Sequence, residues 1–142
     1  MSTKQDSVSQ PCILIVDDEP LNMKLFALTL NRRGYRVLQA GDGYQGFVLA
    51  HDSQPDLIVM DVQLPSLSGL EVARALKESP YTRNIPVVIM TAFLIDDEEL
   101  RQSKCDGYMA KPFIIQNFIG LIESLIERSP HRNPNQVTAA VA

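Results

Sequence analysis

Two kinds of hydrophobic pattern alternate along this chain. Short stretches dominated by apolar residues predict strands at residues 12–16, 35–40, 56–60, 87–90 and 108–110. Between and after them, apolar residues recur every three or four positions, which predicts helices at residues 21–33, 44–52, 70–78, 96–104 and 115–128. Strand and helix signals therefore alternate along the whole chain, with connections of ordinary length.

This alternation predicts an α/β protein with one doubly wound parallel sheet, a flavodoxin-like (βα)5 fold with strand order 2-1-3-4-5. At 142 residues and 45% hydrophobic residues, the chain suits one domain that buries about two-thirds of its unfolded surface. We expect that domain to span residues 11–128. Residues 1–10 and 129–142 show no periodicity, and we expect both tails to be disordered.

Carboxylates follow two of the predicted strands at the point where each strand ends. The central run Leu57–Met60 leads directly into Asp61. The first run, Cys12–Val16, leads into Asp17 and Asp18. In the expected strand order these two strands are neighbours, so their carboxyl ends meet in one crevice. Three acids gathered there repel one another and predict a cation site, and hard oxygen ligands suit Mg²⁺.

The fourth and fifth predicted strands end in residues that suit phosphoryl oxygens. Thr91 supplies a hydroxyl and Lys111 an ammonium group. A carboxylate nucleophile, a divalent cation, a lysine and a hydroxyl are the groups needed for in-line phosphoryl transfer to an aspartate. Taken singly, a strand-end aspartate is more typical of a helix N-cap, and a lysine after a strand is more typical of an ordinary surface position. The agreement of all these strand ends favours the chemical interpretation.

Together these residues resemble the bacterial two-component receiver domain. The shared motif comprises Asp17-Asp18, Asp61 with Leu64-Pro65 and Gly69, Thr91-Ala92, and Tyr108 through Lys111-Pro112-Phe113. The resemblance covers residues 12–128, and this set of motifs is specific. The stretches at residues 18–26 and 85–93 look most like DivK-type single-domain response regulators.

The resemblance implies a role for each acid of the site. Asp61 would accept the phosphoryl group. Asp18, Asp61 and the backbone carbonyl of Gln63 would bind Mg²⁺ directly, and Asp17 would bind it through water.

The resemblance also implies how the phosphoryl group is held and sensed. Thr91 and Lys111 would bind its oxygens, and Tyr108 would change rotamer on activation. The Lys111–Pro112 peptide bond would be cis, which proline permits at modest cost.

A receiver of this kind is expected to take its phosphoryl group from a histidine kinase or histidine phosphotransferase and to signal by docking to a downstream protein. It would catalyse its own phosphorylation and dephosphorylation without being a dedicated enzyme. A net charge of -4 argues against a nucleic-acid partner, and no apolar run is long enough to span a membrane. Two cysteines without disulfide or metal spacing, and a polar start of the chain, fit a cytoplasmic protein.

The fifth predicted strand and the last predicted helix are the expected output surface. Ile114 and Leu121 lie beside the apolar stripe of that helix, where they either contact a partner or widen the buried face. Phosphate on Asp61 is expected to draw Thr91 inward and let Tyr108 occupy the vacated space. A homodimer through the face from the fourth to the fifth helix is a further option.

One segment departs from the usual receiver pattern. The segment from Thr91 to Lys111 is about two residues shorter than the usual receiver spacing, which corresponds to about half a helical turn. Lys104 and Cys105 stand where receivers commonly have a glycine. We therefore expect the fourth helix to be short, to lack a left-handed cap and to lie in a mobile region.

Two other functions stay open. A receiver-shaped adaptor could signal without phosphate, and a flavodoxin-like module could bind a nucleotide or flavin. Against the second, the first strand is followed by acids, which repel an anionic cofactor, and the chain has no P-loop.

Overall fold

The computed structural model describes residues 10–127, which form one five-stranded parallel sheet flanked by helices. The strands are β1 (Cys12–Val16), β2 (Arg36–Ala40), β3 (Leu57–Asp61), β4 (Val87–Thr91) and β5 (Gly107–Ala110). They lie in the order β2-β1-β3-β4-β5, which confirms the predicted fold class and strand order. The expected disordered tails fall, except for residue 10, outside the described residues and stay a prediction.

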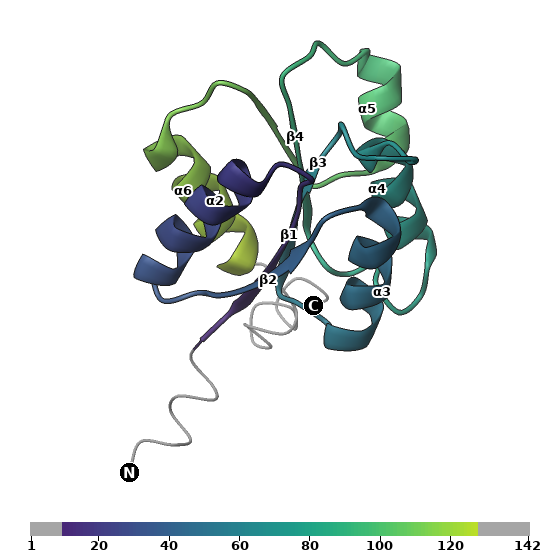
Figure 1. Cartoon of the computed structure of the whole chain (residues 1–142). Coiled ribbons are helices and arrows are strands. Elements are labelled where there is room, and N and C mark those ends of the chain that lie inside the picture. The colour runs from purple at the N-terminus through teal and green to yellow at the C-terminus, as the bar shows by residue number, and fades with distance from the viewer. Residues whose placement is uncertain (1–9, 128–142) are drawn as a thin grey trace, which may run out of the picture.

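Helices cover both faces of this sheet (Figure 1). They are α2 (Pro20–Arg32), α3 (Gly43–Ser53), α4 (Gly69–Glu78), α5 (Asp97–Ser103) and α6 (Ile115–Glu127). α2 and α6 lie on one face, and α3, α4 and α5 lie on the other. An apolar core fills the space under each helix layer. Within residues 10–127, no helix is long and apolar enough to cross a membrane.

The inner strands β1, β3 and β4 are buried along their whole length. Successive side chains of a strand point to opposite faces of the sheet. Ile13 and Ile15 accordingly belong to the core beneath α2 and α6, whereas Leu14 and Val16 belong to the core on the other face. Burial on both faces explains why these strands are continuous apolar runs in the sequence. The edge strands β2 and β5 mix exposed and buried positions.

The helix α2 carries apolar residues on two faces. Its inner face buries Met23, Phe26 and Leu30 in the core. On the other side lie three leucines with exposed fractions of 73%, 53% and 50%: Leu21, Leu25 and Leu28. We call these three residues the α2 leucine strip. Their spacing keeps them on one side of the helix, so they form an apolar strip on the surface.

The helix α5 is short, as the sequence predicts, and covers seven residues. The prediction that it lacks a left-handed cap is wrong. Lys104 has a backbone φ of 59° and ends the helix in the left-handed conformation, with its N–H donated to the carbonyl of Arg101 at 3.1 Å. A lysine therefore takes the place usually given to glycine and bears the steric cost of that conformation.

Replacing Lys104 with Gly should stabilise the protein by about 1 kcal/mol, because glycine adopts a positive φ without a clash at Cβ. Thermal unfolding measures the change. The matched control is Lys104→Ala, which removes the same charged side chain but keeps Cβ, and which should give no such gain. Equal melting temperatures for the two variants would contradict this assignment of strain.

The connection that follows α5 is tied firmly to α4. Lys77 Nζ lies 2.6 Å from Asp106 Oδ2 and also donates to the carbonyl of Ile85 at 2.8 Å. The same Asp106 oxygen accepts from the N–H of Val87 at 2.8 Å. At the other end of the helix, Asp96 makes no capping bond through its side chain. The two ends of α5 are therefore held unequally, and the weakly held end is the one next to the carboxyl edge of the sheet.

Candidate functional site

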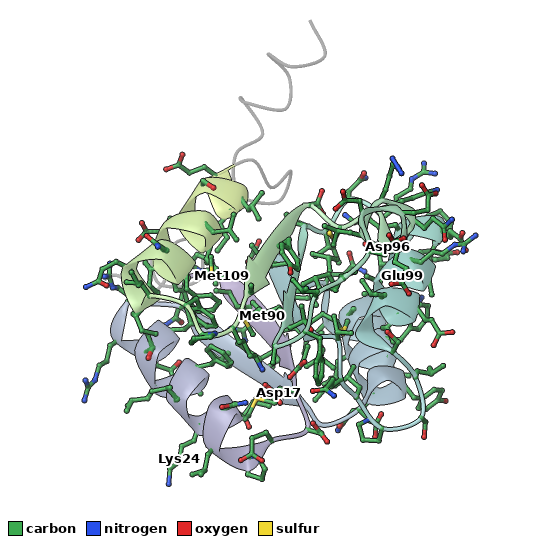
Figure 2. All side chains as sticks on the ribbon, turned by 90° about the horizontal axis from the view of Figure 1, so that it is seen from above. Asp17, Lys24, Met90, Asp96, Glu99 and Met109 are labelled. Atoms are coloured by element: carbon green, nitrogen blue, oxygen red, sulfur yellow. The ribbon has the colours of Figure 1, made fainter. Side chains whose placement is uncertain are left out.

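The site residues predicted from the sequence lie along the carboxyl edge of the sheet. Asp61 and Thr91 end β3 and β4, and Asp17 and Lys111 directly follow β1 and β5. The N–H of Asp17 donates to the carbonyl of Ala40 at 3.1 Å, and that of Lys111 donates to the carbonyl of Thr91 at 2.8 Å. The hydrogen bonding of the sheet thus continues through both residues and fixes their backbones. Viewed from above, Asp17 lies between the two helix layers (Figure 2).

Asp61 is 6% exposed, and each of its carboxylate oxygens has a partner. Lys111 Nζ donates to Oδ2 at 3.0 Å. The backbone N–H of Gln63 donates to Oδ1, also at 3.0 Å. The ion pair joins the carboxyl ends of β3 and β5 across β4, so the lysine lies within bonding distance of this acid.

A turn of the same kind follows three of the strands. Asp17 Oδ1 accepts from the N–H of Glu19 at 2.9 Å, and Thr91 Oγ1 accepts from the N–H of Phe93 at 3.0 Å. Asp61 accepts in the same way from the residue two positions further on. Such bonds from backbone to side chain stabilise tight turns and hold the side chain in one rotamer. These bonds were not predicted from the sequence, although Asp and Thr at strand ends are typical of such turns.

Asp17 is a buried acid with an unpartnered oxygen. It is 2% exposed, and its Oδ2 has no hydrogen-bond partner among the described residues. Burial raises the pKa of Asp17 above its ordinary value of 3.8, and the charges of Asp61 and Asp18 raise it further. The N–H of Glu19 and the ammonium group of Lys111 act in the opposite direction. A divalent cation would satisfy this oxygen and offset the repulsion, so the residues present fit Mg²⁺.

Asp18 and Gln63 are exposed and line a shallow hollow at the rim of the site, together with the loop at residues 62–68. Within residues 10–127, no three His, Cys, Asp or Glu side chains stand close enough to form a metal-binding cluster. The predicted convergence of three acids is therefore met only in part. The carboxylate of Asp61 is paired with Lys111 at 3.0 Å, whereas Asp17 and Asp18 act on each other as like charges. A cation would have to compete with Lys111 for Asp61.

The switch residues predicted from the resemblance lie on neighbouring strands. Thr91 is fully buried, and Tyr108 is exposed. Tyr108 pairs with Ile89, two positions before Thr91 in the β4–β5 ladder. The Lys111–Pro112 peptide bond is cis, as the resemblance implied.

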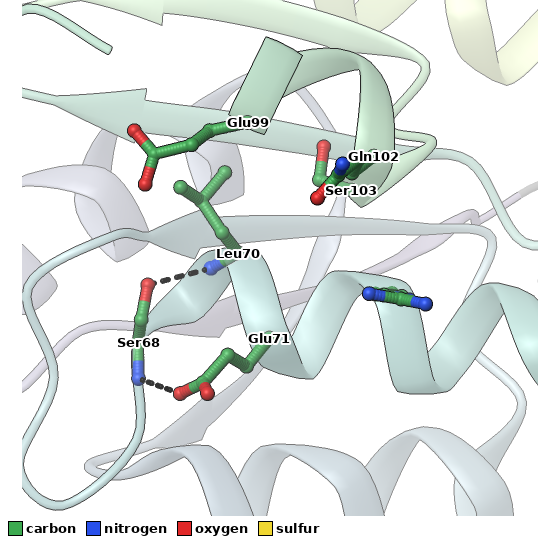
Figure 3. Close-up of a pocket in the computed structure, with 7 residues that line it drawn as sticks. Ser68, Leu70, Glu71, Glu99, Gln102 and Ser103 are labelled. Atoms are coloured by element: carbon green, nitrogen blue, oxygen red, sulfur yellow. Dashed lines mark hydrogen bonds between the residues drawn. The ribbon is translucent and has the colours of Figure 1, made fainter. Parts of the chain in front are cut away.

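A second hollow, not predicted from the sequence, lies between α4 and α5 (Figure 3). Its lining residues are Ser68, Leu70, Glu71, Arg74, Glu99, Gln102 and Ser103. The N–H of Leu70 donates to Ser68 Oγ, the N–H of Ser68 donates to a Glu71 carboxylate oxygen, and Arg74 pairs with Glu78, each at 3.1 Å. Because these polar groups form hydrogen bonds and an ion pair that stabilise α4 itself, we assign this hollow no chemistry.

Comparison with known proteins distinguishes between the functions left open by the sequence. The family model of the response regulator receiver domain matches residues 13–123. The chain belongs to the response regulator receiver family. Receivers act in two-component signalling and are typically phosphoacceptor proteins rather than dedicated enzymes. This membership removes the reason for considering a nucleotide- or flavin-binding module.

Relatives of this receiver include the polar-differentiation response regulators DivK of Brucella anthropi and Brucella ovis. Each is 42% identical over 116 residues, which cover 80% of this chain and 94% of the relative. The narrower resemblance to DivK-type response regulators is thereby confirmed.

Solved structures of other receivers superpose on this receiver. The receiver domain of a sensor histidine kinase from Pseudomonas aeruginosa, with a magnesium ion coordinated in its active-site cleft, matches with a TM-score of 0.76 and 30% identity, covering 83% of this chain and 98% of that one. A Francisella response regulator receiver domain matches with a TM-score of 0.76 and 29% identity, covering 84% of this chain and 98% of that one. Both likenesses agree with the fold described above.

Proposed function

We propose that this receiver accepts a phosphoryl group on Asp61 and signals through contacts with other proteins that depend on phosphorylation. The supporting observation is the 3.0 Å pairing of Asp61 with Lys111, with the buried Thr91 on the strand between them. Of the three acids at this edge, Asp61 is the one with a lysine within bonding distance among the described residues. Phosphoryl transfer needs a cation beside the nucleophile to take up the charge of the incoming group.

In this reaction an oxygen of Asp61 attacks the phosphorus of a phosphohistidine or an acyl phosphate, in line with the bond to the leaving group. A P–O bond to Asp61 forms while the P–N or P–O bond of the donor breaks, and the donor leaves with the electron pair. Lys111 can pass from the carboxylate to a phosphoryl oxygen, because its Nζ already lies 3.0 Å from Oδ2. Thr91 Oγ1 can donate its hydrogen to another phosphoryl oxygen.

The acids of the site are proposed to hold Mg²⁺. Asp18, Asp61 and the carbonyl of Gln63 would bind it directly, and Asp17 would bind it through water. When bound, the cation offsets the charge of the carboxylates and of the phosphoryl group. Two observations support the assignment: Oδ2 of Asp17 has no partner among the described residues, and the receiver from Pseudomonas aeruginosa holds a magnesium ion.

Intact mass after incubation with acetyl phosphate tests the proposed function. With Mg²⁺ the protein should gain one phosphoryl group, and with a chelator it should gain none. A receiver-shaped adaptor that works without phosphate would show no gain under either condition, and that outcome would overturn the proposal.

The α2 leucine strip supports a protein as the phosphoryl donor. Leu21 is the second residue of α2 and closely follows Asp18, so the strip begins at the rim of the site. Its side chains lie outside the core of their own domain, as at surfaces that bind other proteins. We propose that a histidine kinase or histidine phosphotransferase docks along this strip while it presents its phosphohistidine to Asp61.

The signal is proposed to leave through β5 and α6. Binding of a phosphoryl oxygen draws Thr91 toward Asp61, and Tyr108 moves into the space that Thr91 leaves. The two residues beside the apolar stripe of α6 differ from each other. Ile114 is 61% exposed and suits a partner contact, whereas Leu121 is half-buried against the core, where it widens the buried face.

Hydrogen exchange with and without beryllofluoride, a phosphoryl mimic, tests this output route. With Mg²⁺ present, beryllofluoride should change amide protection at Thr91, at Tyr108 and at residues 114–121. The start of α5 should respond more than its end, because Lys77 and Asp106 anchor the end. Asp61→Asn is the control and should show no response. Changes confined to regions far from these residues would contradict the proposed route.

The face formed by α5, β5 and α6 is also the proposed surface for a homodimer. The exposed Phe93 and Leu94 before α5 add apolar area there. The cytoplasmic location expected from the sequence is proposed on the same basis as the kinase partner, because both must occupy one compartment.

A further inference from the structure

Gly69, the first residue of α4, lies directly against the backbone of Asp61. Its N–H donates to the carbonyl of Val62 at 2.9 Å. A Cβ at this position would lie 2.0 Å from the carbonyl oxygen of Asp61, 2.8 Å from its carbonyl carbon and 2.9 Å from Met60 Cγ. The φ of Gly69 is not in the left-handed region, so space and not backbone freedom requires glycine here.

The clash could not be relieved by rotating a side chain, because two of the three atoms belong to the backbone of Asp61. That backbone is itself held in the sheet. Asp61 pairs with Met90 in the β3–β4 ladder, and the next residue, Val62, donates its N–H to the carbonyl of Met90 at 3.0 Å. A side chain at residue 69 would therefore force α4 and the backbone of Asp61 apart.

The start of α4 is held as firmly as the strand. Ser68 Oγ accepts from the N–H of Leu70, and a Glu71 carboxylate oxygen accepts from the N–H of Ser68, both at 3.1 Å (Figure 3). One turn further on, Val72 and Ala73 are buried in the core. Moving α4 outward would break this capping box and open the core, so part of any displacement must fall on Asp61.

We propose that Gly69 is a positioning residue for phosphoryl transfer: with no side chain, it lets α4 set the position of the Asp61 backbone. The inference rests on the proposed function of Asp61. Both oxygens of that carboxylate are held at 3.0 Å, one by the N–H of Gln63 and one by Lys111. A backbone shift of about 1 Å would misplace the nucleophile, and misplacements of that size can cost about a hundredfold in rate.

The rate of labelling of Gly69→Ala by acetyl phosphate at saturating Mg²⁺, followed by intact mass, tests this inference. We expect a rate about tenfold or more below that of the wild type. The matched control is Gly43→Ala, whose Cβ would lie 2.6 Å from Val72 Cγ2, a clash with α4 that does not touch the backbone of Asp61. This control should lose stability and keep the wild-type rate of labelling.

A second measurement does not depend on phosphorylation. The amide resonance of Gln63, whose N–H binds Asp61, should shift in Gly69→Ala and stay in place in Gly43→Ala, both without Mg²⁺. Where Gly69→Ala unfolds in buffer, all proteins are compared in trimethylamine N-oxide, which favours the folded state.

Three outcomes overturn the inference: a folded Gly69→Ala labelled at the wild-type rate, an equal loss of rate in Gly43→Ala, or a Gly69→Ala that stays unfolded even in the osmolyte, since its role is then structural. If the wild type gains no phosphoryl group, the proposed function fails instead, and the Gln63 amide alone decides whether Gly69 lets α4 set the position of the Asp61 backbone.

Discussion

Asp61→Asn should abolish phosphorylation by acetyl phosphate while the protein stays folded. An amide lacks the anionic oxygen that attacks phosphorus, so no acyl phosphate can form. The amide oxygen can still accept from the N–H of Gln63, which keeps the turn after β3. The variant loses its ion pair with Lys111 but no longer repels Asp17, so the two changes in stability oppose each other. Intact mass with Mg²⁺ measures labelling, and circular dichroism measures the fold.

The matched control for this variant is Asp42→Asn. Asp42 follows β2 on the same edge of the sheet and caps α3, where it accepts from the N–H of Gln45 at 2.8 Å. Asparagine caps helices about as well as aspartate, so this variant should be labelled like the wild type. Persistent labelling of a folded Asp61→Asn would show that another residue accepts the phosphoryl group.

The sheet and its functional edge were predictable because burial on both faces leaves an unambiguous pattern. The runs Cys12–Val16 and Leu57–Met60 are apolar at every position, which a strand exposed on one face is not. Once alternation with helices fixed the strand order, the polar residues at the strand ends had to share one edge. The expected places of Asp17, Asp61, Thr91 and Lys111 therefore followed from topology alone.

Contacts that depend on exact distances were not predictable in this way. The hydrophobic pattern of a helix does not distinguish a buried leucine from an exposed one. Leu30 is fully buried and Leu28 is half exposed, yet both are leucines of the same helix. Lys104 shows the same limit, since a lysine carries no sequence signal for a positive φ and takes one because the connection to β5 demands it. Gly69 was part of the recognised motif, but its approach to the Asp61 carbonyl is visible only in three dimensions.

The electrostatic state of the site also depends on geometry. The sequence predicted three acids around a cation; the structure adds that Asp61 pairs with Lys111 and that Oδ2 of the buried Asp17 has no partner among the described residues. Charges of both signs meet at this edge, and only their distances decide which pair forms. A cation bound at this edge would therefore compete with Lys111 for the Asp61 carboxylate.

Asp17→Asn should stabilise the metal-free protein at neutral pH by about 1 kcal/mol or more, because it removes the charge of a buried carboxylate whose Oδ2 has no partner among the described residues. The amide oxygen can keep the bond from the N–H of Glu19. The same variant should weaken the rise in melting temperature that Mg²⁺ produces by binding to the folded state. Thermal unfolding with and without Mg²⁺ measures both effects.

The pH dependence of this gain follows from the raised pKa of Asp17. Because the pKa of the folded state lies above the ordinary value of 3.8, the contribution of this carboxyl to stability is fully present below 3.8 and is lost as the pH rises through the folded-state pKa. Asp17→Asn does not titrate, so its advantage over the wild type should be absent in acid and grow with pH above 3.8. Mg²⁺ favours the ionised form, so its stabilising effect on the wild type should grow over the same range.

The variant Asp18→Asn tests metal binding without removing a buried charge. Asp18 is exposed, so its neutralisation removes no buried charge and should change the stability of the metal-free protein little. It should nevertheless abolish the effect of Mg²⁺, as expected for a direct ligand. If Asp17→Asn fails to stabilise the metal-free protein, burial of the ionised Asp17 carboxylate does not lower the stability of the wild type. If neither variant alters the effect of Mg²⁺, the cation binds elsewhere, because both acids are proposed to hold it at one site.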